Sequence, residues 1–457
     1  MFYAIFFISC QTSTDRSAWL KEQLYIDNRI WLQRDSQLLA DKFREMGTNS
    51  YNFMRGTVPL YYAELTRLNQ NKPSTAFLTQ PESTAIPLFG DPHPENASVL
   101  MQSDGNFDVE FVDLDSATYG PWLFDLRRSA TALRLLGRQF EGCDDRCEEA
   151  LVVGLVEGLS LAYARESYPF EESTIWKDYI EEAIEEGLER KKFYKVTEES
   201  ASSERKIIRS ESLDTNGEGI LDVTTSERNQ AERLGESFAD AHGLVSFRIL
   251  DVVRKFGTGV SSRPAIRYVI LWDQGDSTEN DDVLTQFREI LDPPNMDAVA
   301  YASTAVFHDN ADRINVCEDK LWINSEADPY HHGFWDDGHG FKSMSWNSSL
   351  QDIELHKMTE QWDEGDYALE DIVDFASSLG WMIGHVHHRN TGIDGQATHK
   401  IVQADLISGG GWSKLETELK NHSGNDADFT ERDYELFKQM LEQDGMLLGF
   451  EHIEGVP

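Results

Sequence analysis

The sequence predicts an α+β protein with a mainly helical large part and one small antiparallel sheet. Apolar residues recur at helical spacing over residues 17–68, 123–140 and 369–386. Residues 247–253, 265–272 and 283–290 are instead short apolar stretches, separated by a glycine turn and a polar turn. Because strands joined by such short connections pair antiparallel, these three stretches predict a small sheet.

The chain is long enough for two or three packed units, and it is strongly acidic. Its 457 residues include 24 Phe, 15 Tyr and 11 Trp, which exclude a mainly disordered chain. The formal net charge is −40. Such a charge repels phosphate backbones and anionic lipid, so the composition argues against general nucleic-acid binding. No stretch approaches the ~20 apolar residues of a membrane-spanning helix.

Changes in composition divide the chain into five segments. Residues 1–16 are a lipoprotein signal or a flexible end, and residues 17–195 are a helical region that contains the catalytic-loop segment described below. Residues 196–230 are rich in Ser, Glu, Thr, Asp and Gly, which indicates a mobile linker or insertion. Residues 231–300 contain the predicted sheet, and helices return over residues 301–457.

The N-terminus leaves two cellular locations open. The apolar residues 1–8 are followed by Ser9 and Cys10, as in a bacterial lipoprotein signal whose cysteine carries the lipid. No basic residue precedes the apolar run, and the run is short for an export signal. The chain is therefore either exported and anchored through Cys10, or cytoplasmic with a frayed apolar end or an incorrectly assigned start codon. A local disulfide between Cys143 and Cys147 would require export.

The strongest chemical signal is GDPHPEN at residues 90–96, followed by VEFVDLD at residues 109–115. Phosphoryl transfer needs a carboxylate that orients and deprotonates the attacking hydroxyl, and oxygen ligands that hold Mg²⁺ against the phosphates. Asp91 and Asn96 lie in a loop and Asp113 on a strand, so they can deliver one base and two metal ligands to one point. In the alternative, Asp91 and Asn96 form a turn and bond to local backbone amides.

These segments, together with GPWLFDL at residues 120–126, resemble the catalytic segment of aminoglycoside and choline phosphotransferases. Those enzymes belong to the protein-kinase-like superfamily. The chain resembles more closely a bacterial family known as domain of unknown function 2252. That resemblance covers roughly residues 39–445 and includes four further segments: 53–57, 251–259, 286–289 and 380–387.

The resemblance implies transfer of a phosphoryl group from ATP, with Mg²⁺, to a hydroxyl or amine of an unidentified small molecule or protein. It implies that Asp91 is the catalytic base, Asn96 a metal ligand, Asp113 the principal Mg²⁺ ligand and Asp115 a second ligand. Asp125 would brace the catalytic loop. The alternative for Asp125 is the general role of an Asp at a helix start, which stabilises the helix terminus.

The order of the segments implies a circularly permuted kinase-like core. A kinase places its glycine-rich small lobe before the catalytic loop, whereas the predicted sheet follows it here. If the sheet is the nucleotide lobe, backbone amides at Gly257 and Gly259 approach the phosphates and Arg288 pairs with them. A plain hairpin turn is the alternative for the two glycines.

Two departures from the family favour a different function. Arg288 lies where the family commonly has Lys, and Lys342 alone keeps its charge in a segment that is usually rich in basic residues, 341–346. An exported chain would also lack a supply of ATP. The alternative is therefore a non-catalytic, lipid-anchored binding protein with a degenerate nucleotide pocket.

A third hypothesis is a metal-dependent hydrolase. Two groups of histidines can bind zinc or another transition metal, one near the end of a predicted helix and one in a loop rich in Gly and Asp. These groups are His385, His387 and His388, and His331, His332 and His339. The alternative is that they are ordinary helix-terminal and surface histidines.

Overall fold

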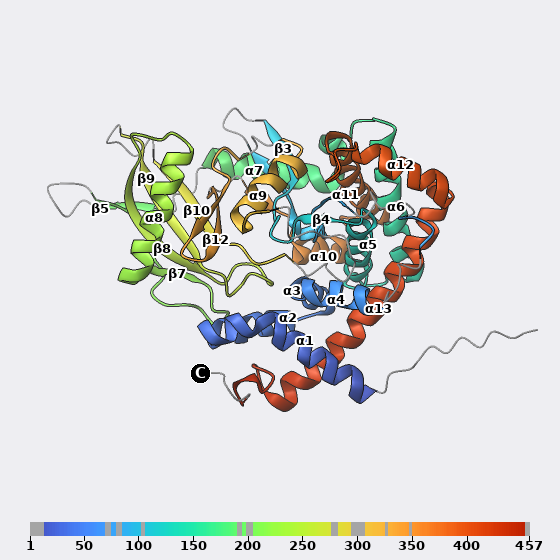
Figure 1. Ribbon diagram of the computed structural model, residues 1–457, viewed down its shortest axis with the longest axis horizontal. Coiled ribbons are helices and arrows are strands. Elements are labelled where there is room, and N and C mark those ends of the chain that lie inside the picture. The colour runs from blue at the N-terminus through green and yellow to red at the C-terminus, as the bar shows by residue number, and fades with distance from the viewer. Residues whose placement is uncertain are drawn as a thin grey trace, which may run out of the picture.

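The computed structural model describes residues 13–68, 75–78, 85–101, 106–189, 194–197, 204–275, 282–293, 307–324, 328–346 and 350–452. These residues form an α+β structure with a six-stranded antiparallel sheet on one side and a helical body on the other (Figure 1). A central segment of short strands and loops lies between them. The predicted α+β class is therefore confirmed.

The three predicted strands form the centre of the large sheet. β8 (Arg248–Phe256), β9 (Arg267–Asp273) and β10 (Val283–Glu289) pair antiparallel in sequence order, as their short connections require. The full strand order is β11-β12-β10-β9-β8-β7. The sheet extends beyond the predicted boundaries of residues 231–300 through three further strands: β7 (Gly219–Asp222), β11 (His332–Asp336) and β12 (His339–Ser345).

Part of the segment predicted as a linker also has regular structure. Residues 204–230 contain β6 (Glu204–Ile207), β7 and the first turn of α8 (Thr225–Ala241), which Thr224 caps together with Glu227. Residues 204–230 therefore include regular structure, so a linker without structure does not describe them, whereas an insertion that adds an edge strand to the sheet does. Residues 198–203 lie outside the described part of the chain.

Alternating side chains give the sheet two unlike faces. α8 covers one of them, where Phe238 packs among Tyr268, Trp272 and Phe287. Full burial of such a side chain stabilises the fold by roughly 1.5–3 kcal/mol. On the opposite face, Val269 and Leu271 pack with Ile207. Arg267 and Arg288, at the adjacent ends of β9 and β10, line the cavity described below.

The helical body is built around the helices that the sequence predicts over residues 123–140 and 369–386. They are α5 (Leu123–Gly137) and α11 (Leu369–Arg389), and they pack with α6 (Asp145–Tyr163), α12 (Thr398–Gly409) and α13 (Trp412–Asp444). α6 and α11 approach backbone to backbone, because a Cβ at Gly158 would lie 1.7 Å from the Ser377 carbonyl oxygen. Only glycine permits this contact.

The N-terminal region is helical and breaks where the sequence predicts. α1 (Ser13–Arg34) and α2 (Ser36–Met46) precede residues 47–49, and α3 (Ser50–Gly56) and α4 (Val58–Leu68) follow. Asn49 starts α3, because its side chain accepts a hydrogen bond from the Asn52 amide. α1 crosses the long α13 in the lower part of Figure 1.

The central segment brings the two motifs of the sequence together. β2 (Ala97–Met101) pairs with β3 (Phe107–Phe111), so residues 90–96 and 109–115 become neighbours. β2 also pairs with β13 (Leu350–Asp352), and β1 (Ile86–Leu88) pairs with β4 (Thr118–Gly120). The other elements include α7 (Thr174–Glu189), β5 (Tyr194–Thr197), α9 (Asn310–Leu321) and α10 (Leu355–Glu364).

The hypotheses about the N-terminus concern residues outside the described part of the chain. Residues 1–12, which include Cys10, are not among those that the structure describes. Lipid anchoring through Cys10 and a cytoplasmic location therefore both stay predictions. Within the described ranges, no helix combines the length and the apolar composition that crossing a membrane requires.

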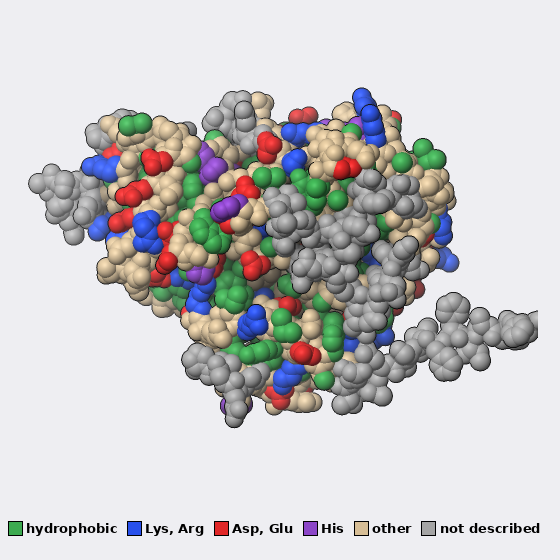
Figure 2. Space-filling view, viewed as in Figure 1, with side chains coloured by type: hydrophobic (Ala, Val, Ile, Leu, Met, Phe, Trp, Pro, Cys, Tyr) green, Lys and Arg blue, Asp and Glu red, His purple; other side chains and the backbone are tan. Residues whose placement is uncertain are grey.

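The charged side chains are mixed on the surface. Figure 2 shows Asp and Glu interspersed with Lys and Arg on the face in view. Several of the basic groups are held in surface ion pairs, such as Arg233 with Asp336 and Arg138 with Asp428. The described part of this face therefore offers no continuous basic patch to a nucleic acid.

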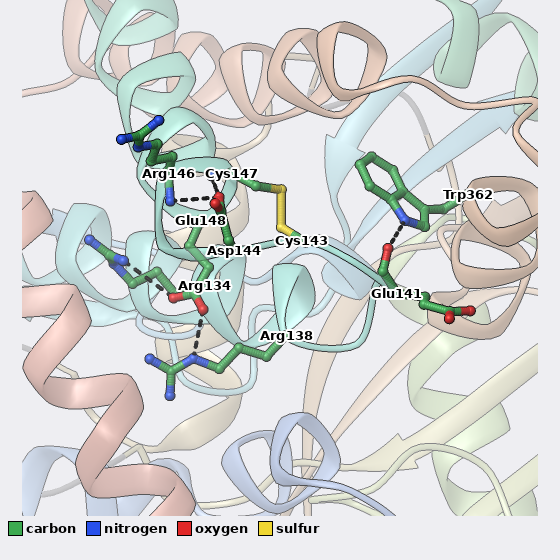
Figure 3. Close-up of a disulfide and its surroundings, with 9 residues drawn as sticks. All are labelled: Arg134, Arg138, Glu141, Cys143, Asp144, Arg146, Cys147, Glu148 and Trp362. Carbon is green, nitrogen blue, oxygen red and sulfur yellow. Dashed lines mark hydrogen bonds and ion pairs between the residues drawn. A yellow bond between two sulfur atoms is a disulfide. The ribbon is translucent and has the colours of Figure 1, made fainter.

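A disulfide joins Cys143 to Cys147 at the start of α6 (Figure 3). Asp144 lies between them and caps α6, because its carboxylate accepts hydrogen bonds from the amides of Arg146 and Cys147. The disulfide therefore closes a short loop against a capped helix start. Disulfides persist in oxidising compartments, which is the condition that export provides.

Removing this disulfide is expected to destabilise the protein modestly. Closing a loop of about five residues lowers the entropy of the unfolded chain by an amount worth about 2 kcal/mol. The Cys143→Ala/Cys147→Ala variant should therefore lose about 2 kcal/mol of unfolding free energy in urea titrations. Wild type in reducing agent is the control and should lose the same amount. Unchanged urea midpoints in both the variant and the reduced wild type would contradict the presence of this disulfide.

Candidate active site

The predicted site residues of the two motifs line one cavity. Asp91, Asn96, Asp113 and Asp115 contribute to a cavity of about 470 Å³ between the central segment and the large sheet. Thr258, Gly259 and Arg288 line the same cavity from the sheet side. The loop-strand spacing and the glycine-turn sheet therefore predicted a real juxtaposition of side chains.

Gly257 is the exception among the predicted site residues. It does not line the cavity, and its left-handed backbone, with φ +82°, packs against β7 instead. A Cβ at Gly257 would lie 2.6 Å from the Glu218 Cα, so the glycine serves close packing of the turn. Gly259, with φ +76°, is the glycine of this turn that faces the cavity.

Asp125 holds the loop that carries Asp91. Its carboxylate accepts hydrogen bonds from the amides of Phe89 at 2.8 Å and Gly90 at 2.9 Å. Burial raises the pKa of Asp125 to about 7, while these two amide hydrogen bonds oppose the rise. Asp125 thus braces the loop, which is the role that the family resemblance implies.

Two further residues of α5 bind the same loop. Arg128 Nε lies 2.7 Å from Asp91 Oδ1, and Ser129 Oγ donates to the Pro92 carbonyl oxygen at 2.5 Å. Residues three and four positions apart share one side of a helix, so Asp125, Arg128 and Ser129 act on the loop together. One face of α5 therefore fixes the position of Asp91.

The turn hypothesis for Asp91 and Asn96 is correct only in part. Asn96 Nδ2 donates to the Asp91 backbone carbonyl at 2.8 Å, so this side chain does bond to local backbone, although to a carbonyl instead of an amide. The Asp91 side chain pairs with Arg128 instead. Its carboxylate is therefore not used to close the turn.

Arg313 fixes the loop that follows Asp113. It is 2% exposed, lies on α9, and donates to the carbonyl oxygens of Asp115 at 2.8 Å, Ala117 at 2.7 Å and Leu291 at 2.9 Å. A buried guanidinium that binds three carbonyl oxygens satisfies backbone groups that otherwise lose their hydrogen bonds. Arg313 therefore joins the aspartate loop to the end of β10.

Four strands of the sheet each bring one basic residue into the cavity. Arg288 on β10 lies opposite Arg267 on β9 and Lys342 on β12, and Lys255 lies on β8. We call these four residues the basic row. Like charges that face one another across strands repel, so the row needs negative charge close by.

Two aspartates supply negative charge to half of the basic row. Arg288 Nη2 lies 2.6 Å from Asp113 Oδ1 and 2.8 Å from Asp115 Oδ1, and Lys342 Nζ lies 3.3 Å and 3.0 Å from the same two atoms. Burial would raise the pKa of Asp113, but Arg288 and Lys342 hold it well below its usual range. Asp113 is therefore ionised and links the central segment to the sheet.

The other half of the basic row, Lys255 and Arg267, forms no ion pair with a carboxylate of the described residues. Arg267 donates to the carbonyl and hydroxyl oxygens of Ser262 at 2.9 Å and 2.8 Å. Burial and the neighbouring Arg267 lower the pKa of Lys255 to about 8, and burial and Arg288 lower the pKa of Arg267 to about 9. Arg267 is buried and Lys255 is half-buried. Because cations withdrawn from water without a counter-charge are costly, this part of the cavity favours an anionic ligand.

The oxygen donors opposite the basic row suit a magnesium ion. Mg²⁺ is usually bound by one or two carboxylates together with phosphate and water oxygens. Asp115 Oδ2 is buried and has no hydrogen-bond partner among the described residues, and the hydrogen bond of Asn96 to the Asp91 carbonyl uses the Asn96 amide nitrogen, not its oxygen. In the described ranges, no three His, Cys, Asp or Glu side chains converge as a metal site. An ion held by Asn96, Asp113 and Asp115 would therefore need phosphate oxygens as well.

The histidine groups do not form the metal site of the third hypothesis within the described residues. His387 Nδ1 lies 3.0 Å from the Tyr163 hydroxyl, and the ring of His388 stacks on that of His399. His331 pairs with Glu318, and His339 pairs with Glu289. The histidines therefore pack against, or pair with, separate neighbours.

Four basic residues of this region are not among the site residues that the sequence predicts: Lys255, Arg267, Arg128 and Arg313. The first two lie within segments that were recognised, and alternation along β8 and β9 places them on the face of Arg288. Arg128 follows Asp125 at helical spacing, which is a usable signal for a shared face. Nothing in the sequence around Arg313 indicates its long-range contacts.

The fold and the cavity define an α+β protein with a mixed-charge site, in which carboxylates of a central segment face basic residues of an antiparallel sheet. The chain belongs to the bacterial family described as uncharacterized protein conserved in bacteria (DUF2252), which matches residues 34–440. The family expected from the sequence is therefore confirmed. No curated protein and no solved structure matches the chain.

Gly90 should be essential for the spacing of the two loops. It has φ +78°, and a Cβ there would lie 2.1 Å from the Ser116 carbonyl oxygen. Gly90→Ala should therefore cost at least about 3 kcal/mol of unfolding free energy, the sum of left-handed strain and a backbone clash. The matched control is Gly365→Ala, with φ +81° and open space, which should cost only about 1–2 kcal/mol. Equal losses in urea titrations would contradict the close contact.

Proposed function

We propose that this protein is a phosphotransferase with a kinase-like, circularly permuted core, and that it uses ATP and Mg²⁺ to phosphorylate a hydroxyl or amine. One observation carries the proposal. Lys255 and Arg267, which lack carboxylate partners among the described residues, line the same cavity as Asp91, Asn96 and Asp113. A polyphosphate supplies the negative charge that these cations lack and further oxygen ligands for magnesium.

In the proposal, the large sheet is the nucleotide lobe and the helical body is the large lobe. The sheet follows the Asp91 loop in the chain but lines the same cavity in space, which is the arrangement that a permuted kinase-like core requires. The turn between β8 and β9 lines the cavity with Thr258 and Gly259, so its backbone can approach phosphate oxygens. The basic row then lies along the phosphates.

Asp91 is the group that orients the acceptor and removes its proton. Arg128 Nε binds Oδ1 at 2.7 Å, and His93 Nε2 lies 3.6 Å from Oδ2, beyond hydrogen-bond distance. Burial raises the pKa of Asp91, and the charge and hydrogen bond of Arg128 oppose the rise. Asp91 therefore has one oxygen fixed by the protein and one oxygen left for the acceptor hydroxyl.

Magnesium, when bound, would neutralise charge on the phosphate oxygens. The residues that would hold it are Asn96, Asp113 and Asp115. Arg288 and Lys342 bind the same aspartates and keep them oriented toward the basic row. The chain thus positions its carboxylates before any ligand enters.

The direct test is ATP binding and turnover with the Asp91→Asn variant. ATP and Mg²⁺ should bind the purified protein, measured by calorimetry, and γ-phosphate should be released or transferred. Asp91→Asn should lower turnover by about 10²–10⁴-fold, because it removes the base, and leave ATP affinity nearly unchanged.

Asp363→Asn on the exposed side of α10 is the matched control and should behave as wild type. Wild-type turnover in Asp91→Asn would contradict the role of Asp91. Absence of ATP binding by the wild type would contradict the proposed function as a whole.

Lys255 should make nucleotide binding depend on pH. Its pKa of about 8 means that it carries a charge at pH 7 and loses it as the pH rises toward 9. The affinity for metal-free ATP should therefore fall between pH 7 and pH 9, as measured by calorimetry, since anion binding favours the protonated amine. Lys255→Met should bind more weakly at pH 7 and lose most of this dependence. The same pH dependence in both proteins would exclude Lys255 as its source.

The disulfide supports a second candidate, a non-catalytic exported binding protein with a degenerate nucleotide pocket. The Cys143–Cys147 bond suits an oxidising compartment, where ATP is not expected. Mass spectrometry of the protein from its native host tests this candidate. Lipid on Cys10 and an oxidised Cys143–Cys147 pair would support it, and an unmodified chain with free thiols would contradict it.

A further inference from the structure

Arg288 and Lys342 have two kinds of partner available in one cavity, aspartate and phosphate. We infer that they exchange one for the other, so that the cavity binds a divalent cation together with a polyphosphate and binds each of them alone only weakly. Because the same cavity carries the proposed function, this exchange rests on that proposal. The exchange adds to that proposal that side chains of this chain couple the binding of the cation to the binding of the polyphosphate.

The ion pairs oppose the binding of a metal alone. Arg288 and Lys342 lie 2.6–3.3 Å from Asp113 Oδ1 and Asp115 Oδ1, on the two carboxylates that a cation would use. A divalent cation at these oxygens is repelled by both side chains. Lys342 is 1% exposed, so solvent and salt screen its charge only weakly. A free metal must therefore compete with two fixed positive charges.

The same ion pairs oppose the binding of a polyphosphate alone. Lys255 and Arg267 can accept an anion without losing a carboxylate partner of the described residues, but Arg288 and Lys342 must first release Asp113 and Asp115. Asp115 is 8% exposed, and an unpaired buried carboxylate is costly. An anion without a metal therefore leaves the two aspartates without sufficient positive charge.

Neither the repulsion of the metal nor the loss of the aspartates' partners arises when the cation and the polyphosphate bind together. Arg288 and Lys342 then turn from aspartate to phosphate oxygens, while the aspartates bind the cation. Asp115 Oδ2, which is buried and has no hydrogen-bond partner in the described ranges, is the oxygen that can accept the cation first. Linkage requires the effect to be reciprocal, so phosphate must raise metal affinity by the same factor by which metal raises phosphate affinity.

The test measures the two ligands separately on the full chain. Mn²⁺ alone and inorganic tripolyphosphate alone, with a metal chelator present, are titrated by calorimetry. Arg288→Met should raise Mn²⁺ affinity about tenfold and lower tripolyphosphate affinity about tenfold, in the range usual for coupled sites. Asp115→Asn should produce the opposite pair of changes, because it removes a metal ligand and releases the basic side chains.

The matched control is Arg248→Met, which removes the same charge from the same sheet at a side chain that is 69% exposed. Both affinities should stay within about twofold of wild type, because salt screens exposed charges. Circular dichroism and a cooperative unfolding curve show whether each variant is folded. If Arg288→Met does not fold, Lys342→Met tests the same exchange.

Opposite changes in the two affinities support the exchange. Parallel losses of both affinities in a folded Arg288→Met variant would overturn it, and ATP turnover by the wild type would still support the proposed function. Tight binding of Mn²⁺ alone by the wild type, unaffected by Arg288→Met, would also overturn it. If neither Mn²⁺ nor tripolyphosphate binds any folded variant, the exchange fails, whereas the proposed function fails only if the wild type does not bind ATP together with Mg²⁺.

Discussion

The contact of Arg288 and Lys342 with Asp113 and Asp115 joins two parts of the chain that are distant in sequence. It ties the large sheet to the central segment, and Arg313 adds a second link through backbone carbonyls. Removing one partner of such a buried pair typically costs about 3–5 kcal/mol, because the other charge stays unpaired. The residues that would bind ligands are therefore also residues that hold the fold together.

The opposite wall of the cavity is fixed independently, by α5. Asp125 and Arg128 determine where Asp91 lies, while Gly90 allows the loop to pass close to residue 116. Two rigid supports thus face each other across a polar cavity. A site whose groups are oriented before the ligand arrives needs little reorganisation on binding.

The sequence predicted much of the local structure and the main juxtaposition, but not the contacts that depend on topology. Helical and strand periodicity located α5, α11 and β8 to β10, and the spacing of Asp91, Asn96 and Asp113 indicated one site. Composition did not reveal the regular structure of residues 204–230, because β6 and β7 are only four residues long and polar loop residues surround them. The sequence predicts that the backbone amide of Gly257 approaches phosphate, whereas the structure packs this residue closely against Glu218. Arg128, Arg267 and Arg313 were missed, because their partners lie on other elements.

The central claim is that the basic row and the aspartates form one site for a metal-bound polyphosphate. A crystal structure with a non-hydrolysable ATP analogue and Mn²⁺, located by anomalous scattering, tests it most directly. The claim predicts Mn²⁺ bound to oxygens of Asn96, Asp113 or Asp115, and phosphate oxygens within hydrogen-bond distance of Lys255 and Arg267. A nucleotide bound elsewhere, with the ion pairs of Arg288 and Lys342 to the aspartates intact, would contradict it.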